Sequence, residues 1–126
     1  NGTIVARNAE QGQALATRYG FRWQAYLGAA GAPLLINVTP IGMAGGDADA
    51  LAFPETMIAA SLVVIDVVQY PPETRLLRAA QAAGKRIITG TEIATLQALD
   101  QFVLYTGVTP SDDQVADAAA FARAAG

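Results

Sequence analysis

The residues best suited to binding a ligand lie in one short stretch, 37–43, with the sequence Asn-Val-Thr-Pro-Ile-Gly-Met. An apolar run, 33–36, precedes this stretch, and a Gly-rich loop, 44–47, follows it. The pattern is typical of a buried parallel strand that ends in a loop, and open α/β sheets bind ligands at the carboxyl ends of their strands. The amide of Asn37 can donate and accept hydrogen bonds at once, and Gly42 allows the main chain to approach a ligand closely. The alternative is a polar turn after a core strand, since Asn-x-Thr-Pro is also common turn chemistry.

The composition excludes several kinds of chemistry. The chain has 126 residues with no His and no Cys, which removes Ser-His-Asp triads, thiol nucleophiles and the usual zinc ligands, so no metal site is expected. Any reaction must therefore use Lys, Asp, Glu or Tyr, a bound cofactor, or residues outside this chain. A net charge of −3 argues against a nucleic-acid partner, because binding nucleic acid requires a basic face.

The length favours one domain or one part of a larger protein. With 52% hydrophobic residues there is enough apolar material for a core. The longest apolar runs, such as 61–65, are too short to span a bilayer, and no segment at the start resembles a signal peptide. The absence of Cys fits a protein without disulfides, so we expect a cytoplasmic location and no membrane partner.

Segments with strand and helix patterns alternate along the chain. Apolar or β-branched runs predict strands at 3–6, 21–26, 34–38, 62–68 and 85–89. Helices are expected from the cap Asn8 to Gly20, as one turn at 54–58, from Pro71 and Pro72 to Gly84, and at 91–106 and 111–125. The run 62–68 is almost wholly apolar, which is typical of a parallel strand covered on both faces. The alternation predicts an α/β fold with a doubly wound parallel sheet.

The predicted sheet lacks its usual first strand. A dinucleotide-binding sheet begins with a strand, the loop G-x-G-x-x-G and a helix, and its second strand ends near the ribose. This chain has no such loop, and its opening strand ends at Arg7, where a ribose-reading residue lies in a second strand. Because the first strand occupies the middle of such a sheet, its absence leaves unpaired backbone groups on both sides. We therefore expect residues upstream of Asn1 to be missing and the isolated chain to be poorly stable; a closed sheet would contradict this.

A family resemblance rests on blocks that follow one another in a fixed order. They are 37–43, 66–68 (Asp-Val-Val), 71–77 (Pro-Pro-Glu-Thr-Arg-Leu-Leu), 90–97 (Gly-Thr-Glu-Ile-Ala-Thr-Leu-Gln) and 102–107 (Phe-Val-Leu-Tyr-Thr-Gly). In this order, over nearly the whole chain, they resemble the carboxyl half of shikimate dehydrogenases. Single pieces such as Asn-x-Thr-Pro are weak signals, and the order of the blocks makes the resemblance specific.

The resemblance implies an enzyme that reduces 3-dehydroshikimate to shikimate with NADPH. Family members have an amino-terminal substrate domain that carries a catalytic Lys and Asp, followed by a Rossmann domain. The resemblance therefore implies that residues 1–126 are the carboxyl-terminal part of the dinucleotide-binding domain, without the amino-terminal catalytic domain. On this basis the chain contains no catalytic residue and is inactive alone.

Five positions correspond to binding residues of the family. Arg7 matches an arginine that contacts the adenosine 2′-phosphate, a role suited to a planar and permanently charged group; the alternative is an exposed strand-end arginine. Asn37 and Thr39 match the loop beside the nicotinamide ribose. Gly90 matches a glycine whose backbone lies near the nicotinamide, or it is simply a helix-start glycine. Gln97 matches a glutamine that hydrogen-bonds substrate, or it is a polar residue on a helix face.

The chain also departs from the family pattern. Gln11 stands where a second arginine is common, which leaves NAD as an alternative to NADP. Gln69 stands where a tyrosine is common, and Glu92 replaces a glycine and brings a carboxylate near the nicotinamide position. These changes indicate a divergent branch with another hydroxy acid, such as quinate, as an alternative substrate.

Three other residues have structural interpretations. Asp66 either orients a ligand at a strand end or caps the turn that follows, and the second role is favoured. Tyr70 and Tyr105 are expected to be partly buried aromatic residues rather than proton donors.

Three functions compete. The first is the cofactor-binding portion of an NADP-dependent dehydrogenase, in which the cofactor supplies the hydride and the substrate is a small shikimate-like hydroxy acid. The second is a non-catalytic dinucleotide-binding or regulatory module, since such folds host many functions. The third is a proteolytic remnant that pairs with a second copy across exposed strand edges as a homodimer.

Overall fold

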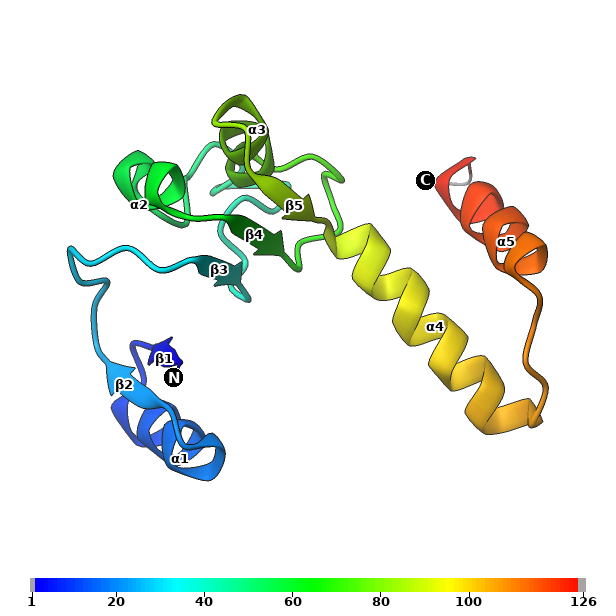
Figure 1. Cartoon of the computed structure of the whole chain (residues 1–126), viewed down its shortest axis with the longest axis horizontal. Coiled ribbons are helices and arrows are strands. Elements are labelled where there is room, and N and C mark those ends of the chain that lie inside the picture. Colours follow the sequence, from blue (N-terminus) through cyan, green and yellow to red (C-terminus); the bar gives the residue numbers. More distant parts are fainter. Residues whose placement is uncertain (1, 125–126) are drawn as a thin grey trace. The chain divides into compact units, whose positions relative to one another are not determined.

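The strands form two separate parallel sheets. The computed structural model describes residues 2–124, and the side chains of residues 2–122. The chain divides into two compact units, residues 1–30 and residues 31–126. The first unit holds the sheet β1-β2 and the second holds the sheet β3-β4-β5 (Figure 1). The α/β class with parallel strands is confirmed, and the part of the chain that the structure describes contains no closed sheet.

The first unit is a single strand-helix-strand motif. It consists of β1 (Thr3–Val5), α1 (Ala9–Tyr19) and β2 (Arg22–Gln24), with β1 and β2 paired in parallel. Asn8 caps α1 as predicted, because its Oδ1 accepts a hydrogen bond from the backbone N–H of Gln11 at 3.0 Å. The helix ends at Gly20, whose left-handed backbone (φ 67°) suits glycine. β2 is shorter than the predicted strand at 21–26.

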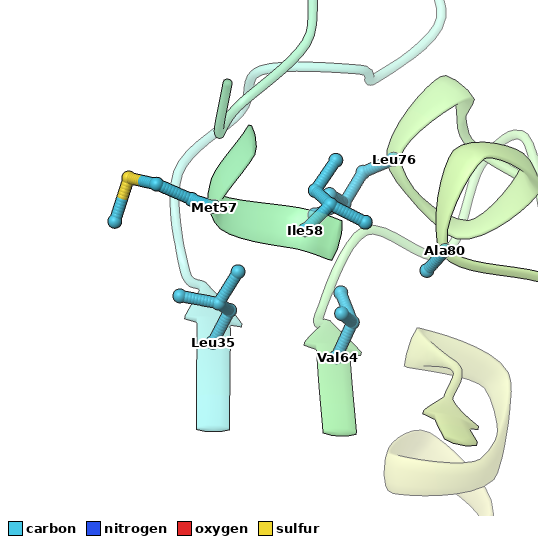
Figure 2. Close-up of a cluster of buried hydrophobic side chains, with 6 residues drawn as sticks. All are labelled: Leu35, Met57, Ile58, Val64, Leu76 and Ala80. Carbon is cyan, nitrogen blue, oxygen red and sulfur yellow. The ribbon is translucent and has the colours of Figure 1, made fainter. Parts of the chain in front are cut away.

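The second unit carries the main core. Its elements are β3 (Leu34–Asn37), α2 (Glu55–Ala60), β4 (Val63–Asp66), α3 (Arg75–Ala82), β5 (Arg86–Ile88), α4 (Gly90–Thr106) and α5 (Asp112–Ala124). A cluster of buried apolar side chains joins α2 and α3 to one face of β3 and β4, and consists of Leu35, Met57, Ile58, Val64, Leu76 and Ala80. In Figure 2 the strand side chains of this cluster point toward the helices. Burial of this face holds the carboxyl ends of β3 and β4 in place.

The opposite face of this sheet is not fully covered. Val63 and Ile65 of β4 are half-buried, while Leu34 and Ile36 of β3 are each 46% exposed. The prediction that 62–68 is covered on both faces is therefore wrong for the residues described. The physical reason is that α2 and α3 both pack on the same face, through Leu35 and the rest of the core cluster.

Helix α3 begins later than the sequence predicts. The pair Pro71 and Pro72 precedes the helix rather than opening it, and the first helical residue is Arg75. Thr74 is the N-cap, because its Oγ1 accepts a hydrogen bond from the backbone N–H of Leu77 at 3.2 Å. The helix therefore starts after the residue whose hydroxyl accepts from a first-turn N–H, as is typical of an N-cap.

The two carboxyl-terminal helices match their predicted positions. α4 begins at Gly90 after a capping box formed by Thr89 and Glu92. α5 follows a second capping box, in which Ser111 and Gln114 exchange hydrogen bonds. The last residue of the predicted helix 111–125 lies outside the described residues. Over residues 2–124, no helix combines the length and hydropathy needed to cross a membrane.

Candidate functional site

The predicted ligand-binding edge is built around a buried pair of polar side chains. Asn37 is the last residue of β3 and Asp66 is the last residue of β4, and the two are partners in the parallel register. Their side chains are 2% and 0% exposed. Asn37 Nδ2 donates a hydrogen bond to Asp66 Oδ1 at 3.0 Å. Two neighbouring strands are thus joined at their carboxyl ends by side chains as well as by backbone.

The amide of Asn37 makes its hydrogen bonds within the chain. Its Nδ2 also donates to the backbone oxygen of Ile41 at 3.1 Å. Its Oδ1 accepts from the backbone N–H of Thr39 at 3.1 Å and from Thr39 Oγ1 at 2.7 Å. Two donors and two lone pairs are then all occupied. Asn37 therefore shapes the loop that follows β3, and the exposed part of that loop, including Thr39, faces outward.

Asp66 links three segments of the chain. Its Oδ1 accepts from Asn37 and from the backbone N–H of Val68 at 3.1 Å. Its Oδ2 accepts from Thr74 Oγ1 at 2.6 Å. The favoured interpretation, that Asp66 caps the turn after β4, agrees with these contacts. The polar cluster of Asn37, Thr39, Asp66 and Thr74 is called the edge network below.

Thr74 is the member of the edge network to which the sequence analysis assigned no role. It is fully buried and it both donates to Asp66 and caps α3. A usable signal existed, since a hydroxyl residue directly before a helical run is a typical N-cap. No local sequence pattern predicts the contact of Thr74 with Asp66, because this contact depends on how the loop after β4 folds back.

The loops after β3 and β4 also touch through their backbones. The N–H of Ala44 donates to the backbone oxygen of Tyr70 at 2.9 Å. Gly42 is buried with φ 91°, and a Cβ at this position would lie 3.4 Å from Thr74 Cβ. The close approach that Gly42 permits is therefore toward the neighbouring loop. Tyr70 itself is 65% exposed and Tyr105 is 81% exposed, so the prediction that both are partly buried is wrong.

Gly90 joins α4 to the same edge. A Cβ on Gly90 would overlap the backbone oxygen of Val68 and would lie 2.6 Å from the backbone oxygen of Val67. The first residue of α4 is therefore packed directly on the segment that follows β4. Of the two interpretations of Gly90, the structure supports a helix-start glycine required by packing, and its proximity to a nicotinamide stays a prediction.

The carboxylate of Glu92 is hydrogen-bonded to the N-cap residue of its own helix. Its carboxylate accepts hydrogen bonds from the backbone N–H of Thr89 at 2.7 Å and from Thr89 Oγ1 at 2.9 Å. These two hydrogen bonds lower the pKa of Glu92 below its ordinary value. The carboxylate expected near the nicotinamide therefore serves as the capping residue of α4.

The remaining two candidates take no part in the hydrogen bonds of the edge network. Arg7 is exposed and belongs to the first unit, where Ala6 before it is held by hydrogen bonds from the Trp23 indole (3.2 Å) and to the backbone of Gln24 (3.1 Å). Gln97 is exposed on α4 and takes no part in the network. Asn37, Thr39 and Gly90 therefore meet at one edge, and the roles of Arg7 and Gln97 stay predictions.

Comparisons with known proteins identify the family. No protein-family model matches the chain. The chain is 49% identical over 121 residues to a shikimate dehydrogenase-like protein of Haemophilus influenzae, covering 95% of this chain and 45% of that protein. A solved shikimate 5-dehydrogenase-like protein has a TM-score of 0.89 at 48% identity, covering 96% of this chain and 45% of that one. The chain belongs to the shikimate dehydrogenase family.

A second solved member of the shikimate dehydrogenase family carries ligands. The shikimate 5-dehydrogenase of Thermus thermophilus, in complex with NADP(H) and shikimate, has a TM-score of 0.79 at 31% identity, and the match covers 95% of this chain and 45% of that one. The family resemblance and the Rossmann-like fold are thus confirmed. The chain spans less than half the length of these relatives.

Proposed function

We propose that this chain is the cofactor-binding portion of an NADP-dependent shikimate dehydrogenase, which reduces 3-dehydroshikimate to shikimate. The observation that carries the proposal is the edge network at the ends of β3 and β4, with α4 packed against it. It occurs in a chain that is 31% identical to a shikimate 5-dehydrogenase in complex with NADP(H) and shikimate. Strand ends of a parallel sheet are where such folds bind dinucleotides.

The residues present fit a dinucleotide phosphate. Arg7 offers an exposed guanidinium after β1, which suits the 2′-phosphate of NADP. Thr39, presented by the edge network, lies beside the nicotinamide ribose in this proposal, and Gln97 on α4 contacts the substrate. When bound, NADPH supplies the hydride, and these residues bind and orient the reactants.

The proton chemistry belongs to another part of the protein. This chain has no His or Cys, and Glu92 is engaged in its capping box. In the proposal the Lys and Asp pair of the family stands in an amino-terminal half of the same polypeptide. The complete protein is then a cytoplasmic enzyme, and residues 1–126 alone are inactive.

The test is a shikimate-dependent assay of the complete protein with NADP, followed by the absorbance of NADPH. We expect NADPH to form only when shikimate is present, and none to form with residues 1–126 alone. Cofactor binding without turnover of shikimate or quinate would contradict the proposal and favour a non-catalytic dinucleotide-binding module. Faster turnover of quinate than of shikimate would indicate that this divergent protein, with Gln69 where a tyrosine is common, acts on a different hydroxy acid.

A further inference from the structure

Asp66 receives hydrogen bonds from three segments of the chain, of which β3 is 29 positions away in sequence and the other two follow β4. Its donors are a side chain of β3 (Asn37), a backbone N–H of the loop after β4 (Val68) and the N-cap hydroxyl of α3 (Thr74). A carboxylate that is 0% exposed is costly unless it is fully hydrogen-bonded. An apolar residue on the same face, as at Val64, fills the core without this cost. The carboxylate of Asp66 therefore has a role beyond packing, which is to hold these three segments together by hydrogen bonds.

The orientation of the Asn37 amide depends on Asp66. Because Asn37 Nδ2 donates to Asp66 Oδ1, the amide oxygen must point the other way, toward Thr39. Thr39 Oγ1 then accepts from the backbone N–H of Ile41 at 3.2 Å. An uninterrupted series of hydrogen bonds thus runs from the N-cap of α3 through Asp66 to the exposed loop after β3. A fully satisfied buried network of this kind specifies one arrangement of its members.

We propose that Asp66 is a positioning residue that couples the loop after β4 to the loop after β3. Through Thr74 and Asn37, it sets where Thr39 is presented. The proposal rests on the proposed function, in which Thr39 faces the nicotinamide end of the cofactor. Losing the coupling displaces the cofactor relative to the substrate. A displacement of about 1 Å at a reacting centre can lower the rate about a hundredfold.

The variants isolate the coupling from general stability. Thr74→Val removes the hydroxyl that binds Asp66, and Thr74→Ser restores it. Asp66→Asn keeps the side-chain volume but replaces one acceptor oxygen by a donor, and serves if Thr74→Val does not fold. The matched control is Ser61→Ala, since Ser61 is a buried hydroxyl (1% exposed) at the opposite end of β4, where its Oγ donates to the backbone oxygen of Ile58 at 2.8 Å.

Two measurements on the complete protein test the coupling. The first is amide hydrogen exchange at Thr39 and Ile41, and the second is kcat with shikimate and NADP. For Thr74→Val and Asp66→Asn we expect exchange at both amides to rise about tenfold, as for one lost hydrogen bond. We expect kcat to fall about tenfold or more. Thr74→Ser should restore both values, and Ser61→Ala should change neither beyond its effect on global stability.

The outcomes separate this inference from the proposed function. Exchange at Thr39 and Ile41 that is the same in Thr74→Val as in Ser61→Ala would overturn the coupling. An unchanged kcat in an active protein would overturn the positioning role. If the unmodified protein does not oxidise shikimate, the proposed function fails, and the exchange measurement alone decides whether Asp66 couples the two loops.

Discussion

Asn37 shows how a residue at the end of a strand can hold the loop that follows it. Its side chain donates to Ile41 and Asp66 and accepts twice from Thr39. Any ligand that bound the amide directly would have to displace one of these hydrogen bonds. In the proposal, the contact with cofactor therefore falls to polar groups that the loop exposes, of which Thr39 is the first.

In the proposal, Arg7 is the residue on which the choice of cofactor depends. In the complete protein, we expect Arg7→Ala to weaken the binding of NADPH about tenfold to a hundredfold, because a hydrogen bond to a charged group contributes about 1.5–3 kcal/mol. The binding of NADH should change little, since NADH has no 2′-phosphate. The measurement is the dissociation constant of each cofactor. The matched control is Arg18→Ala, an exposed arginine at the other end of α1. Equal losses for NADPH and NADH would contradict the assigned role.

Gly90 tests the packing of α4 on the end of β4. Gly90→Ala places a methyl group against the backbone oxygens of Val67 and Val68, which cannot move without disturbing the strand end. We expect a loss of about 1–3 kcal/mol in the free energy of unfolding, as for other overpacked sites. Chemical denaturation of the complete protein measures it. Gly46→Ala is the control, because a Cβ there meets nothing within 4 Å. Equal stability of the two variants would refute the packing role.

Helix α4 is defined at its ends more than along its length. Its start has the capping box of Thr89 and Glu92, and its end has Gly107 in the left-handed conformation (φ 69°). Between them, Leu96 is 61% exposed and Leu104 is 78% exposed. A helix with apolar residues on several sides is usually buried in the complete protein. Local capping therefore accounts for where this helix begins and ends in the described chain.

The capping box of α4 makes a pH-dependent contribution to the stability of the folded state. Hydrogen bonds from Thr89 lower the pKa of Glu92 from its ordinary 4.5, so the charged carboxylate stabilises the folded state above this pH. The contribution is lost as the pH falls through the lowered, folded-state pKa. Glu92→Gln keeps an acceptor for the capping box but removes the charge. We expect it to cost about 0.3–1 kcal/mol near neutral pH at low ionic strength, and nothing in acid.

Denaturation midpoints of the complete protein at the two pH values provide the measurement. The control is Asp100→Asn, an exposed carboxylate in the middle of α4, which lies too far from the helix end for the dipole effect. A difference between wild type and Glu92→Gln that grows toward acid pH would contradict the assignment.

The molecule as a whole leaves apolar surface uncovered. One face of β3 exposes Leu34 and Ile36, and the middle of α4 exposes Leu96. The two sheets, β1-β2 and β3-β4-β5, share no hydrogen-bonded strand pair among the described residues. In the proposal, the complete protein supplies a further strand that pairs with a sheet edge left open here, as in other dinucleotide-binding sheets.

The stability of residues 1–126 by themselves tests this view. We expect this chain to unfold at a lower denaturant concentration than the complete protein, because it buries less apolar surface per residue. It should also bind a hydrophobic dye that the complete protein does not bind. Equal denaturation midpoints, with no dye bound, would show that the chain needs no further strand.

Features that depend on near neighbours were predictable from the sequence. The caps of α1 and α5, the position of α4 and the parallel α/β class follow from residues within a few positions of each other. The order of the family blocks was likewise sufficient to recognise shikimate dehydrogenases. The family resemblance also indicates the five candidate site residues, but it does not predict which contacts those residues make. The five are Arg7, Asn37, Thr39, Gly90 and Gln97.

Contacts between distant residues required the folded chain. Asn37 and Asp66 are 29 positions apart, and they meet because β3 and β4 are paired in a particular register. Thr74 reaches Asp66 only because the loop after β4 folds back, and this contact places the start of α3 after Pro71 and Pro72. The exposure of one face of β3 likewise depends on distant segments, because α2 and α3 both pack on the other face. Burial and hydrogen bonding of a side chain depend on which distant segments surround it, and local patterns do not contain that information.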